Sequence, residues 1–309
     1  MRQRHLVSLK DYARPDLEEI FDLARRLKAE PGRYAEALKG KALAMVFQKP
    51  STRTRVSFEV GMFQLGGTAL YLGGDAMQLG RGETIPDTAR VLSRFVDAIM
   101  ARVFAHQDVT DLARFATVPV INGLSDLLHP CQALADYFTV LERRGSLEGV
   151  KLAYVGDGNN VCHELMFAGV KLGVRVAVAT PEGYEPNPLI VKSAARDAQK
   201  LGASPPEILR DPGAAVAGAH VVYTDVWTSM GQEAEGVARQ QAFQGYQVGP
   251  DLMARAAGDA VFMHCLPAHR GEEVAAEVLD GPRSVVFDQA ENRLHTQKAL
   301  LLLLLGAKP

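Results

Sequence analysis

The sequence predicts an α/β protein of two domains, each a parallel β-sheet flanked by helices. The first observation is length, because 309 residues exceed the usual size of one domain. The second is the alternation of short apolar runs with helical patterns, which is typical of βαβ units. The third is that unusual polar segments follow directly after apolar runs, where parallel strands present their ligand-binding ends. We therefore expect an active site in a cleft between two domains.

The apolar runs are bounded by Gly, Pro, Asn or Asp and predict the strands. A polar break near residues 145–150 divides the chain into domains 1–147 and 148–289, and a leucine-rich helix at about 290–309 is expected to pack back on the first domain. A helix from about Pro130 to Leu141 would connect the halves. The expected strands are Ala42–Phe47, Thr68–Leu72, Ala98–Val103 and Val118–Ile121, then Leu152–Val155, Arg175–Ala179, His220–Thr224, Ala260–Met263 and Ser284–Phe287.

The composition of the chain argues against several classes of protein. A formal net charge of −2 provides no basic field for nucleic acid or an anionic membrane, so any anion site must be local. The longest apolar run, Ala299–Leu305, is far shorter than the ~20 residues of a membrane span. Residues 1–10 are charged and show no signal peptide. Three cysteines do not suggest a disulfide framework and favour the cytoplasm.

An anion site is predicted at residues 51–55, Ser-Thr-Arg-Thr-Arg, where a strand turns into a helix. Free backbone N–H groups, the positive helix end, hydroxyls and guanidiniums within one turn suit a phosphate. The alternative is an ordinary capped helix start with surface arginines. Val56, Val60 and Phe63 are expected to begin the buried face of this helix. Another helix is predicted to begin at Thr84, with Pro86 in its first turn and an apolar face within residues 91–96.

Three more residues of the first half are candidates. His129 precedes the helix-initiating Pro130 and could donate a hydrogen bond to a carbonyl oxygen, or it could be a satisfied loop histidine. Gln132 offers an amide on the same turn. Arg102 ends an apolar strand, where its charge needs a carboxylate or an anionic ligand.

The second half offers groups suited to an amine. Residues 156–160, Gly-Asp-Gly-Asn-Asn, resemble a nucleotide-binding turn only weakly, because the third glycine is missing. Asp225 could bind an ammonium group, with Ser229 near it, or it could be a turn residue. Cys265 follows His264 and could be a nucleophile, a metal ligand, an amine-binding thiolate or an inert buried thiol. Side chains alternate along a strand, so we do not expect His264 and Cys265 to form a dyad.

Four motifs together resemble the aspartate/ornithine carbamoyltransferase family over essentially the whole chain: Ser-Thr-Arg-Thr-Arg at 51–55, His-Pro-Cys-Gln at 129–132, Asp-x-x-x-Ser-Met at 225–230 and His-Cys-Leu-Pro at 264–267. The last two are similar to the ornithine branch. The resemblance implies carbamoyl transfer from carbamoyl phosphate to ornithine, with Arg102, His129, Asp225 and Cys265 as catalytic residues. It implies that carbamoyl phosphate is bound by Ser51, Thr52, Arg53, Thr54, Gln78, Arg102, His129, Gln132, Cys265, Leu266 and Arg293, and ornithine by Asn160, Asp225, Ser229 and Met230.

The resemblance also implies a homotrimer with active sites near subunit interfaces, Gln78 reaching a neighbouring site, and no metal or cofactor. Aspartate, N-acetylornithine and putrescine remain alternative acceptors. A nucleotide-binding dehydrogenase and a catalytically inactive partner protein are alternatives from other classes. The sequence does not show whether the protein works in arginine synthesis or in arginine breakdown. It also leaves open assembly beyond the trimer, thermal stability and allosteric regulation.

Overall fold

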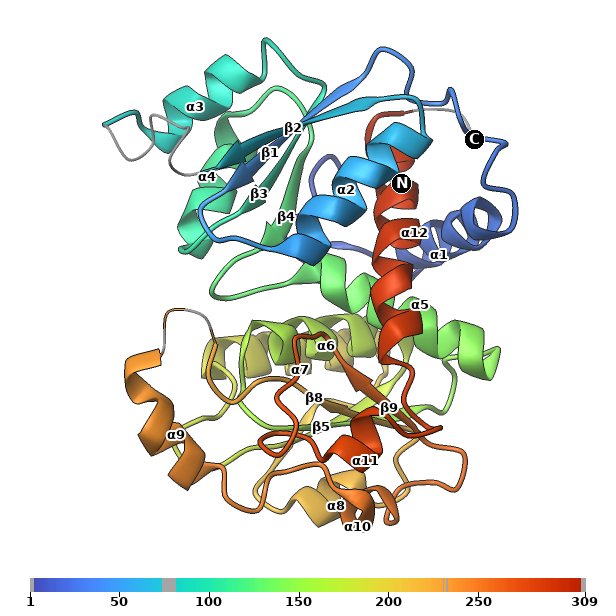
Figure 1. Cartoon of the computed structure of the whole chain (residues 1–309), viewed down its shortest axis with the longest axis vertical. Helices are drawn as coiled ribbons and strands as arrows, with labels where there is room; N and C mark the ends of the chain where they lie inside the picture. The colour runs from blue at the N-terminus through green and yellow to red at the C-terminus, as the bar shows by residue number, and fades with distance from the viewer. Residues whose placement is uncertain (1–2, 74–81, 230, 232, 307–309) are drawn as a thin grey trace. The chain divides into compact units, whose positions relative to one another are not determined.

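The computed structural model describes residues 3–73, 82–229, 231 and 233–306 of the chain. The chain divides into two compact units: unit 1 comprises residues 1–138 and 291–309, and unit 2 comprises residues 139–290. Each unit contains a parallel β-sheet flanked by helices, which confirms the predicted fold class (Figure 1). The divisions fall inside two helices, α5 (Pro130–Arg144) and α12 (Val286–Leu304).

The sheet of unit 1 has the strand order β2-β1-β3-β4, with every neighbouring pair parallel. The inner strands β1 and β3 are buried almost throughout, as expected for strands covered on both faces. All four predicted strands of this half are confirmed, with ends shifted by at most a few residues. Their bounds are β1 Ala42–Phe47, β2 Thr68–Gly73, β3 Ala98–Arg102 and β4 Val120–Leu124.

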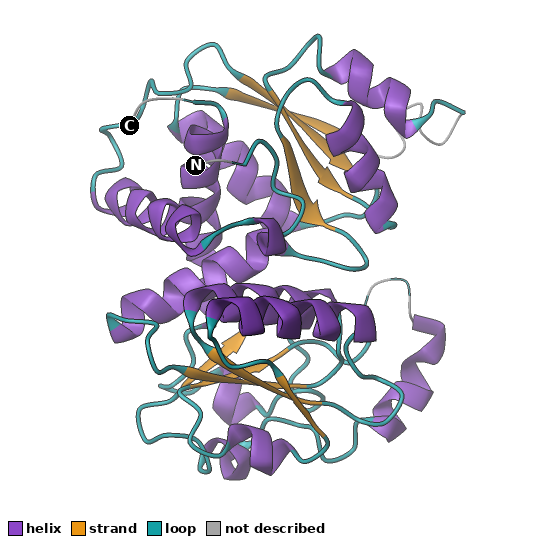
Figure 2. Cartoon of the chain, turned by 180° about the vertical axis from the view of Figure 1, so that it is seen from behind, coloured by secondary structure: helices purple, strands orange, loops and turns teal. Residues whose placement is uncertain are grey.

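Helices cover both faces of this sheet, with α3 and α4 on one side and α1, α2 and α12 on the other (Figures 1 and 2). Helix α3 begins as predicted, because Thr84 Oγ1 accepts a hydrogen bond from the backbone N–H of Asp87. The terminal helix joins unit 1 as predicted, and Gln297 Nε2 donates to Ser57 Oγ of α2 at 2.7 Å. The helices are η1 Leu9–Asp11, α1 Arg14–Ala29, α2 Thr52–Gln64, α3 Ile85–Leu92 and α4 His106–Phe115, with the first part of α5 and most of α12.

The predicted buried face of α2 is wrong. Val56 and Val60 are half exposed and Phe63 is 79% exposed, whereas Phe58 and Met62 are buried. Apolar residues occur on two faces of this helix at helical spacing, so periodicity could not decide which one faces the core. The apolar face expected within residues 91–96 is also only partly buried: Phe95 follows the end of α3 and is exposed.

Unit 2 has a five-stranded parallel sheet of order β7-β6-β5-β8-β9. The short edge strand β7 was not predicted, because its three residues carry little apolar pattern. The strand predicted at Ser284–Phe287 is wrong: helix α12 begins at Val286, and only an isolated bridge joins Ser284 to Phe262. The other four predictions are confirmed; the strands are β5 Lys151–Val155, β6 Arg175–Ala179, β7 Glu207–Leu209, β8 Val221–Thr224 and β9 Val261–His264.

Two groups of helices enclose this sheet, α6 and α7 on one face and α8, α10 and α11 on the other (Figure 1). The core between the strands and the second group contains Val155, Val222 and Phe262, all fully buried.

Within the described part of the chain, no helix is both long and apolar enough to span a bilayer. The helices are α6 Asn160–Leu172, α7 Pro188–Leu201, α8 Pro212–Val216, η4 Glu233–Glu235, α9 Gly236–Ala242, α10 Pro250–Met253 and α11 Ala276–Leu279.

Candidate functional site

The helix start predicted as an anion site exists in unit 1. Ser51 is the N-cap of α2, and its hydroxyl accepts a hydrogen bond from the backbone N–H of Thr54 at 3.2 Å. Strand β1 ends four residues earlier, so the N-terminus of α2 opens at the carboxyl end of the sheet. The backbone N–H groups of a first helical turn attract negative charge.

Buried polar side chains from three further elements gather at this helix start. Arg293 of α12 donates from Nη1 to Gln132 Oε1 of α5 at 2.8 Å and from Nη2 to Thr54 Oγ1 at 3.3 Å. Gln132 in turn donates to Asp136 Oδ1 at 2.8 Å. Arg293 is therefore fixed between α2 and α5. We call Ser51, Arg53, Thr54, Arg102, His129, Gln132 and Arg293 the anion site.

His129 has the most strongly perturbed environment in the anion site. Burial lowers the pKa of His129 well below its usual value, and the nearby charges of Arg293, Arg102 and Arg53 lower it further. The ring is therefore neutral at physiological pH. Its Nδ1 has no hydrogen-bond partner among the residues that the structure describes. A neutral imidazole surrounded by three guanidiniums can bind the carbonyl oxygen of an anionic substrate without competing for its phosphate.

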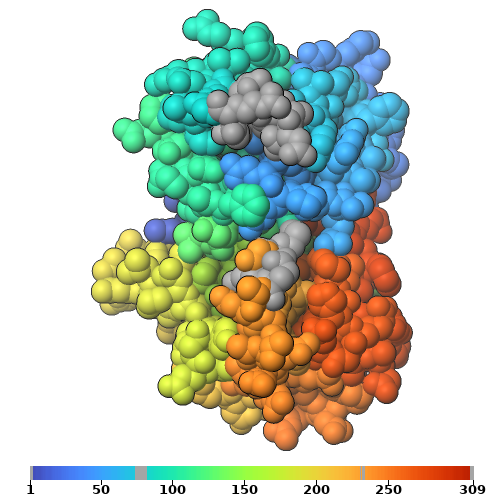
Figure 3. Space-filling model, turned by 60° about the vertical axis from the view of Figure 1, so that its left-hand side comes forward, coloured from blue at the N-terminus to red at the C-terminus, as the bar shows by residue number. Residues whose placement is uncertain are grey.

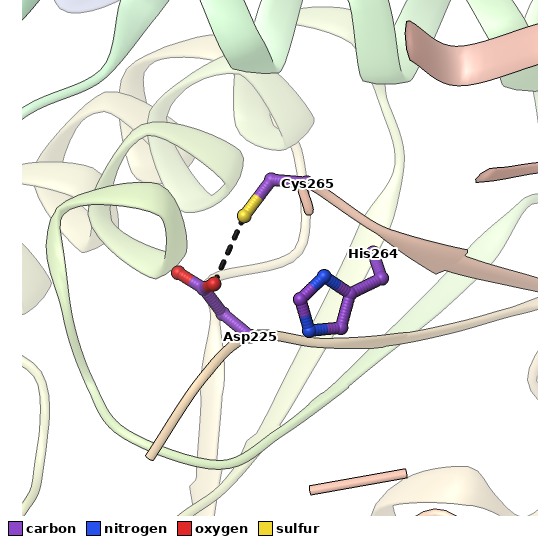
Figure 4. Close-up of side chains that lie close together, drawn as sticks. All are labelled: Asp225, His264 and Cys265. Atoms are coloured by element: carbon purple, nitrogen blue, oxygen red, sulfur yellow. Dashed lines mark hydrogen bonds between the residues drawn. The ribbon is translucent and has the colours of Figure 1, made fainter. Parts of the chain in front are cut away.

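A second candidate site lies in unit 2, at the carboxyl ends of β8 and β9. Cys265 Sγ donates a hydrogen bond to Asp225 Oδ1 at 2.9 Å (Figure 4). Asn159 Nδ2 donates to Asp225 Oδ2 at 2.7 Å, and the Asn159 side-chain oxygen caps α6. Asp225 is only 6% exposed, so its carboxylate is held by neutral donors in a desolvated position. We call Asn159, Asp225 and Cys265 the amine site, because a carboxylate and a thiol suit a cationic amine.

His264 lies beside this pair without joining it by a hydrogen bond (Figure 4). Its Nδ1 accepts from the backbone N–H of Leu266, so the proton is on Nε2, which faces Glu273 Oε1 at 3.2 Å. Burial raises the pKa of Glu273, but the hydrogen bonds from His264 and from the backbone of His269 outweigh it, and the net shift is downward.

A metal ion fits this arrangement poorly. Ligand atoms of Asp225, His264 and Cys265 come within 4.8 Å of one another. Both ring nitrogens of His264 are nevertheless engaged in hydrogen bonds, and the thiol of Cys265 donates a hydrogen bond to Asp225. Binding a metal there would break the Cys265–Asp225 hydrogen bond and one of the two hydrogen bonds of His264.

Comparison with known proteins identifies the chain's relatives. Two family models match, described as "Aspartate/ornithine carbamoyltransferase, carbamoyl-P binding domain" over residues 4–142 and "Aspartate/ornithine carbamoyltransferase, Asp/Orn binding domain" over residues 148–304. The chain belongs to the aspartate/ornithine carbamoyltransferase family. The predicted resemblance is thereby confirmed.

Individual members of this carbamoyltransferase family match over nearly their full length. An ornithine carbamoyltransferase of Thermococcus kodakarensis is 60% identical over 98% of this chain and 96% of its own. The structure of ornithine carbamoyltransferase from Pyrococcus furiosus is 60% identical, covers 99% of this chain and 98% of its own, and superimposes with a TM-score of 0.94. The structure of the anabolic ornithine carbamoyltransferase from Campylobacter jejuni is 38% identical and covers 99% of this chain and 100% of its own. It superimposes with a TM-score of 0.93.

Most residues that the carbamoyltransferase resemblance implied lie at one of the two sites. Thr52 begins α2, and Asn160 begins α6 directly after Asn159. Leu266 follows Cys265 and has a positive φ of 57°, which turns the chain sharply after β9. Ser229 lies four residues beyond Asp225 in the loop after β8. Gln78 and Met230 lie outside the described residues.

Sequence reasoning missed three contributors. Asn159 is part of the 156–160 turn and received no role of its own from the sequence, yet its side chain donates directly to Asp225. Glu273 and Arg239 carry buried charge far from any recognised motif. Both lie in polar segments, Glu273 after Glu272 and Arg239 before Gln240, so the local sequence does not indicate that either charge is buried.

Another loop of the protein packs closely against the turn at residues 156–160, where a dinucleotide would have to bind. A Cβ atom on Gly158 would overlap the backbone of Pro186 and Glu185. Asp157 faces Arg239 Nη1 at 3.0 Å. The glycine therefore serves close packing of two loops of the carbamoyltransferase fold, which argues against the dehydrogenase alternative.

Proposed function

We propose that the protein transfers the carbamoyl group of carbamoyl phosphate to the side-chain amine of L-ornithine, giving L-citrulline and phosphate. Family membership supports the carbamoyl donor, and 60% identical relatives named ornithine carbamoyltransferase support the acceptor. The observation that carries the proposal is the hydrogen-bonded Asp225–Cys265 pair, because it provides an anionic, buried partner for an ammonium group.

Carbamoyl phosphate is assigned to the anion site of unit 1. The phosphate would bind the N-terminus of α2 with Ser51, Thr52, Arg53 and Thr54. Arg102, His129 and Gln132 would hold the carbonyl and amide end, with Arg293 between them. Three cations around a neutral histidine match a substrate with a dianionic phosphate and an uncharged carbamoyl group.

Ornithine is assigned to the amine site of unit 2, with Asn160, Ser229 and Met230 completing its contacts and Leu266 next to the reacting groups. Aspartate as acceptor would place a second carboxylate against Asp225, and like charges repel. N-acetylornithine and putrescine keep the reacting amine and differ only at the other end of the molecule. They are therefore the informative comparison substrates.

The reaction needs a neutral amine. A lysine-like ammonium has a pKa of about 10.4 and is almost fully protonated near neutral pH. Transfer into the desolvated amine site favours proton loss, while Asp225 and Cys265 orient the nitrogen. The nitrogen lone pair then forms a C–N bond to the carbonyl carbon, the C–O bond to phosphate breaks, and phosphate leaves with the electron pair and takes up the proton that the nitrogen loses. Arg102, His129 and Thr54 stabilise the developing oxyanion.

These substrate assignments imply a domain organisation. We infer that residues 1–147 with the helix at about 290–309 form the carbamoyl phosphate-binding domain and that residues 148–289 form the ornithine-binding domain. The descriptions of the two matching family models support the two roles and a boundary near residue 147, and the grouping of residues 291–309 with unit 1 supports the place of the helix, which the second model includes in its own range of 148–304. Both bound substrates must meet for transfer to occur.

The direct test measures citrulline formation and phosphate release in parallel, with ornithine, N-acetylornithine, putrescine and aspartate as acceptors. We expect stoichiometric citrulline and phosphate with ornithine and little product with the others. Equal or better use of another amine would reassign the acceptor. Phosphate release without any carbamoylated product would contradict the proposal as a whole.

We also propose a homotrimer with active sites near its subunit interfaces. An apolar surface supports it, made of Val56, Val60 and Phe63 at helical spacing on one face of α2, all exposed. The light-blue region that contains α2 is part of the face seen in Figure 3. Such surfaces commonly mark an interface with another protein, here a second copy of the chain. Gln78, proposed to reach a neighbouring site, lies outside the described residues.

A cytoplasmic location completes the proposal. All three cysteines, Cys131, Cys162 and Cys265, are free thiols. Burial raises the pKa of Cys162 well above its usual value and so keeps that thiol unreactive. A reducing compartment preserves the thiol of Cys265 that the amine site uses.

A further inference from the structure

Arg239 is a buried arginine that the reaction described above does not use. It lies on α9 in unit 2, and its side chain is 7% exposed. One nitrogen, Nη1, donates both to Asp157 Oδ2 at 3.0 Å and to the backbone carbonyl of Trp227 at 2.9 Å. Its Nε donates to Glu235 Oε2 at 3.0 Å, and the guanidinium lies 5.0 Å from the centre of the Tyr184 ring.

These contacts connect the two segments that form the amine site. Asp157 lies two residues before Asn159, whose side chain donates to Asp225. Trp227 lies between Asp225 and Ser229 in the loop after β8. Arg239 therefore ties the β5–α6 turn to the β8 loop with a single planar cation.

The same helix also holds the Trp227 side chain. Phe243, which follows the end of α9, stacks on Trp227 with ring centroids 5.6 Å apart and contacts Tyr184 at 4.9 Å. Two residues at α9 therefore hold the β8 loop in place. Arg239 donates to the backbone carbonyl of Trp227, and Phe243 stacks on the Trp227 ring. Rigid support of this kind is what positions a binding loop.

Stability alone explains the Arg239–Asp157 pair poorly. Burial raises the pKa of Asp157 to about 6 even though the charge of Arg239 opposes that shift. The pair is thus formed at a considerable desolvation cost, and buried ion pairs of this kind often contribute little net stability. What the pair does provide is geometry, since a guanidinium fixes the directions of its hydrogen bonds.

We propose that Arg239 is a positioning residue for ornithine, which holds the 156–159 turn and the 225–229 loop in the arrangement that presents Asp225 and Ser229 to the amino acid. The inference rests on the proposed ornithine site. Arg239 touches neither substrate; it acts through Trp227 and Asp157. It follows that losing Arg239 weakens ornithine binding and leaves carbamoyl phosphate binding in unit 1 unaffected.

The test compares Arg239→Gln, Arg239→Lys and the double variant Arg239→Gln/Asp157→Asn, which removes both buried charges. Arg270→Gln is the matched control, because Arg270 is a half-exposed arginine of unit 2 that pairs with Asp280. For each variant, the KM values for ornithine and carbamoyl phosphate and the kcat are measured. We expect the KM for ornithine to rise about tenfold or more in Arg239→Gln, because a displaced 225–229 loop would lose about one charge-assisted hydrogen bond to ornithine.

In the same variant the KM for carbamoyl phosphate should stay within about twofold, and Arg239→Lys should recover part of the ornithine affinity. The control should match the wild type.

Trp227 provides a second readout, because it is the only tryptophan in the sequence. It is 8% exposed, so its fluorescence reports on the loop itself. We expect a red shift and stronger acrylamide quenching in Arg239→Gln, with no change in the control.

The inference is overturned by an unchanged KM for ornithine, or by KM values for both substrates that rise together. It is also overturned if Arg239→Gln and the double variant both fail to fold while Arg239→Lys is normal, because Arg239 would then be a folding residue. A wild type that does not carbamoylate ornithine contradicts the proposed function instead.

Discussion

His129 shows how strongly a single side chain depends on its neighbours in this protein. From sequence it was equally a carbonyl donor or a satisfied loop histidine. The structure places it beside Arg53, Arg102 and Arg293, which come from three separate elements. Burial and these charges both keep the ring neutral, so it can serve a carbonyl oxygen while the arginines bind the phosphate.

Arg53→Ala should remove most of the activity and leave the protein folded. Arg53 lies in the first turn of α2 and is only partly buried, so its loss leaves no core cavity. We expect kcat/KM to fall by roughly 10²–10³-fold, the usual effect of removing one donor to a developing charge. Citrulline assays with circular dichroism measure both effects. Arg25→Ala, which removes an exposed arginine of α1, serves as the control, and activity near the wild-type level in Arg53→Ala would refute the phosphate assignment.

His129→Gln should reduce the amount of stability that the protein loses when the pH falls. The folded protein keeps His129 neutral, whereas the unfolded chain binds a proton at that residue below about pH 6.5. The unfolded state therefore binds more protons as the pH falls, and the free energy of unfolding decreases below about pH 6.5. Thermal unfolding at about pH 7.5 and 5.5 should show a smaller drop in Tm for the variant than for the wild type. An equal drop would mean that His129 is protonated in the folded state.

At the scale of elements, the strand ends determine where chemistry occurs. The Asp225–Cys265 pair follows two adjacent parallel strands, β8 and β9, and this placement was predictable because such strands end at one edge of the sheet. The buried face of α2 was not predictable. Phe58 and Met62 compete with Val56, Val60 and Phe63 for the core, and only the position of α12 settles which side is covered.

Gly158→Ala should disturb the amine site through the β5–α6 turn. The added methyl group would overlap the backbone of Pro186 and Glu185, which cannot move as easily as a side chain. Moving the turn shifts Asn159 away from Asp225, so we expect the KM for ornithine to rise severalfold and Tm to fall. Gly258→Ala is the matched control, because its added methyl group meets no atom within 4 Å. If both variants behave alike, close packing at Gly158 does not position the turn.

At the scale of the whole molecule, the chain is divided into two α/β units that each contain one candidate site. The first unit is completed by the chain's last helix, so a residue at position 293 belongs with residues 51–54. The face of α2 with Val56, Val60 and Phe63 retains exposed apolar side chains among the residues that the structure describes. A second copy of the chain would remove them from water.

Phe63→Glu should reduce the assembled mass. Phe63 is 79% exposed on α2, so a charge there is harmless to a single chain but costly inside an interface between copies. We expect the wild type to show about three times the chain mass of 33.5 kDa by light scattering and the variant to shift toward a single chain. Lys39→Glu changes charge at an exposed site of unit 1 outside the apolar surface and should leave the mass unaltered. A monomeric wild type would contradict the trimer.

The sequence by itself determined the fold class, the order of the motifs and the location of Ser51, Arg53, Asp225 and Cys265 at the ends of strands. These are consequences of local patterns, because periodicity, helix caps and the alternation of strand and helix are encoded within a few residues. Only the tertiary structure decided that Arg293 joins Thr54 and Gln132, that Asn159 reaches Asp225, and that Arg239 ties two loops together. Apart from the bond of Arg239 to the Trp227 carbonyl, these contacts join residues 66 to 239 positions apart, and no local pattern specifies which distant partner a buried charge will meet.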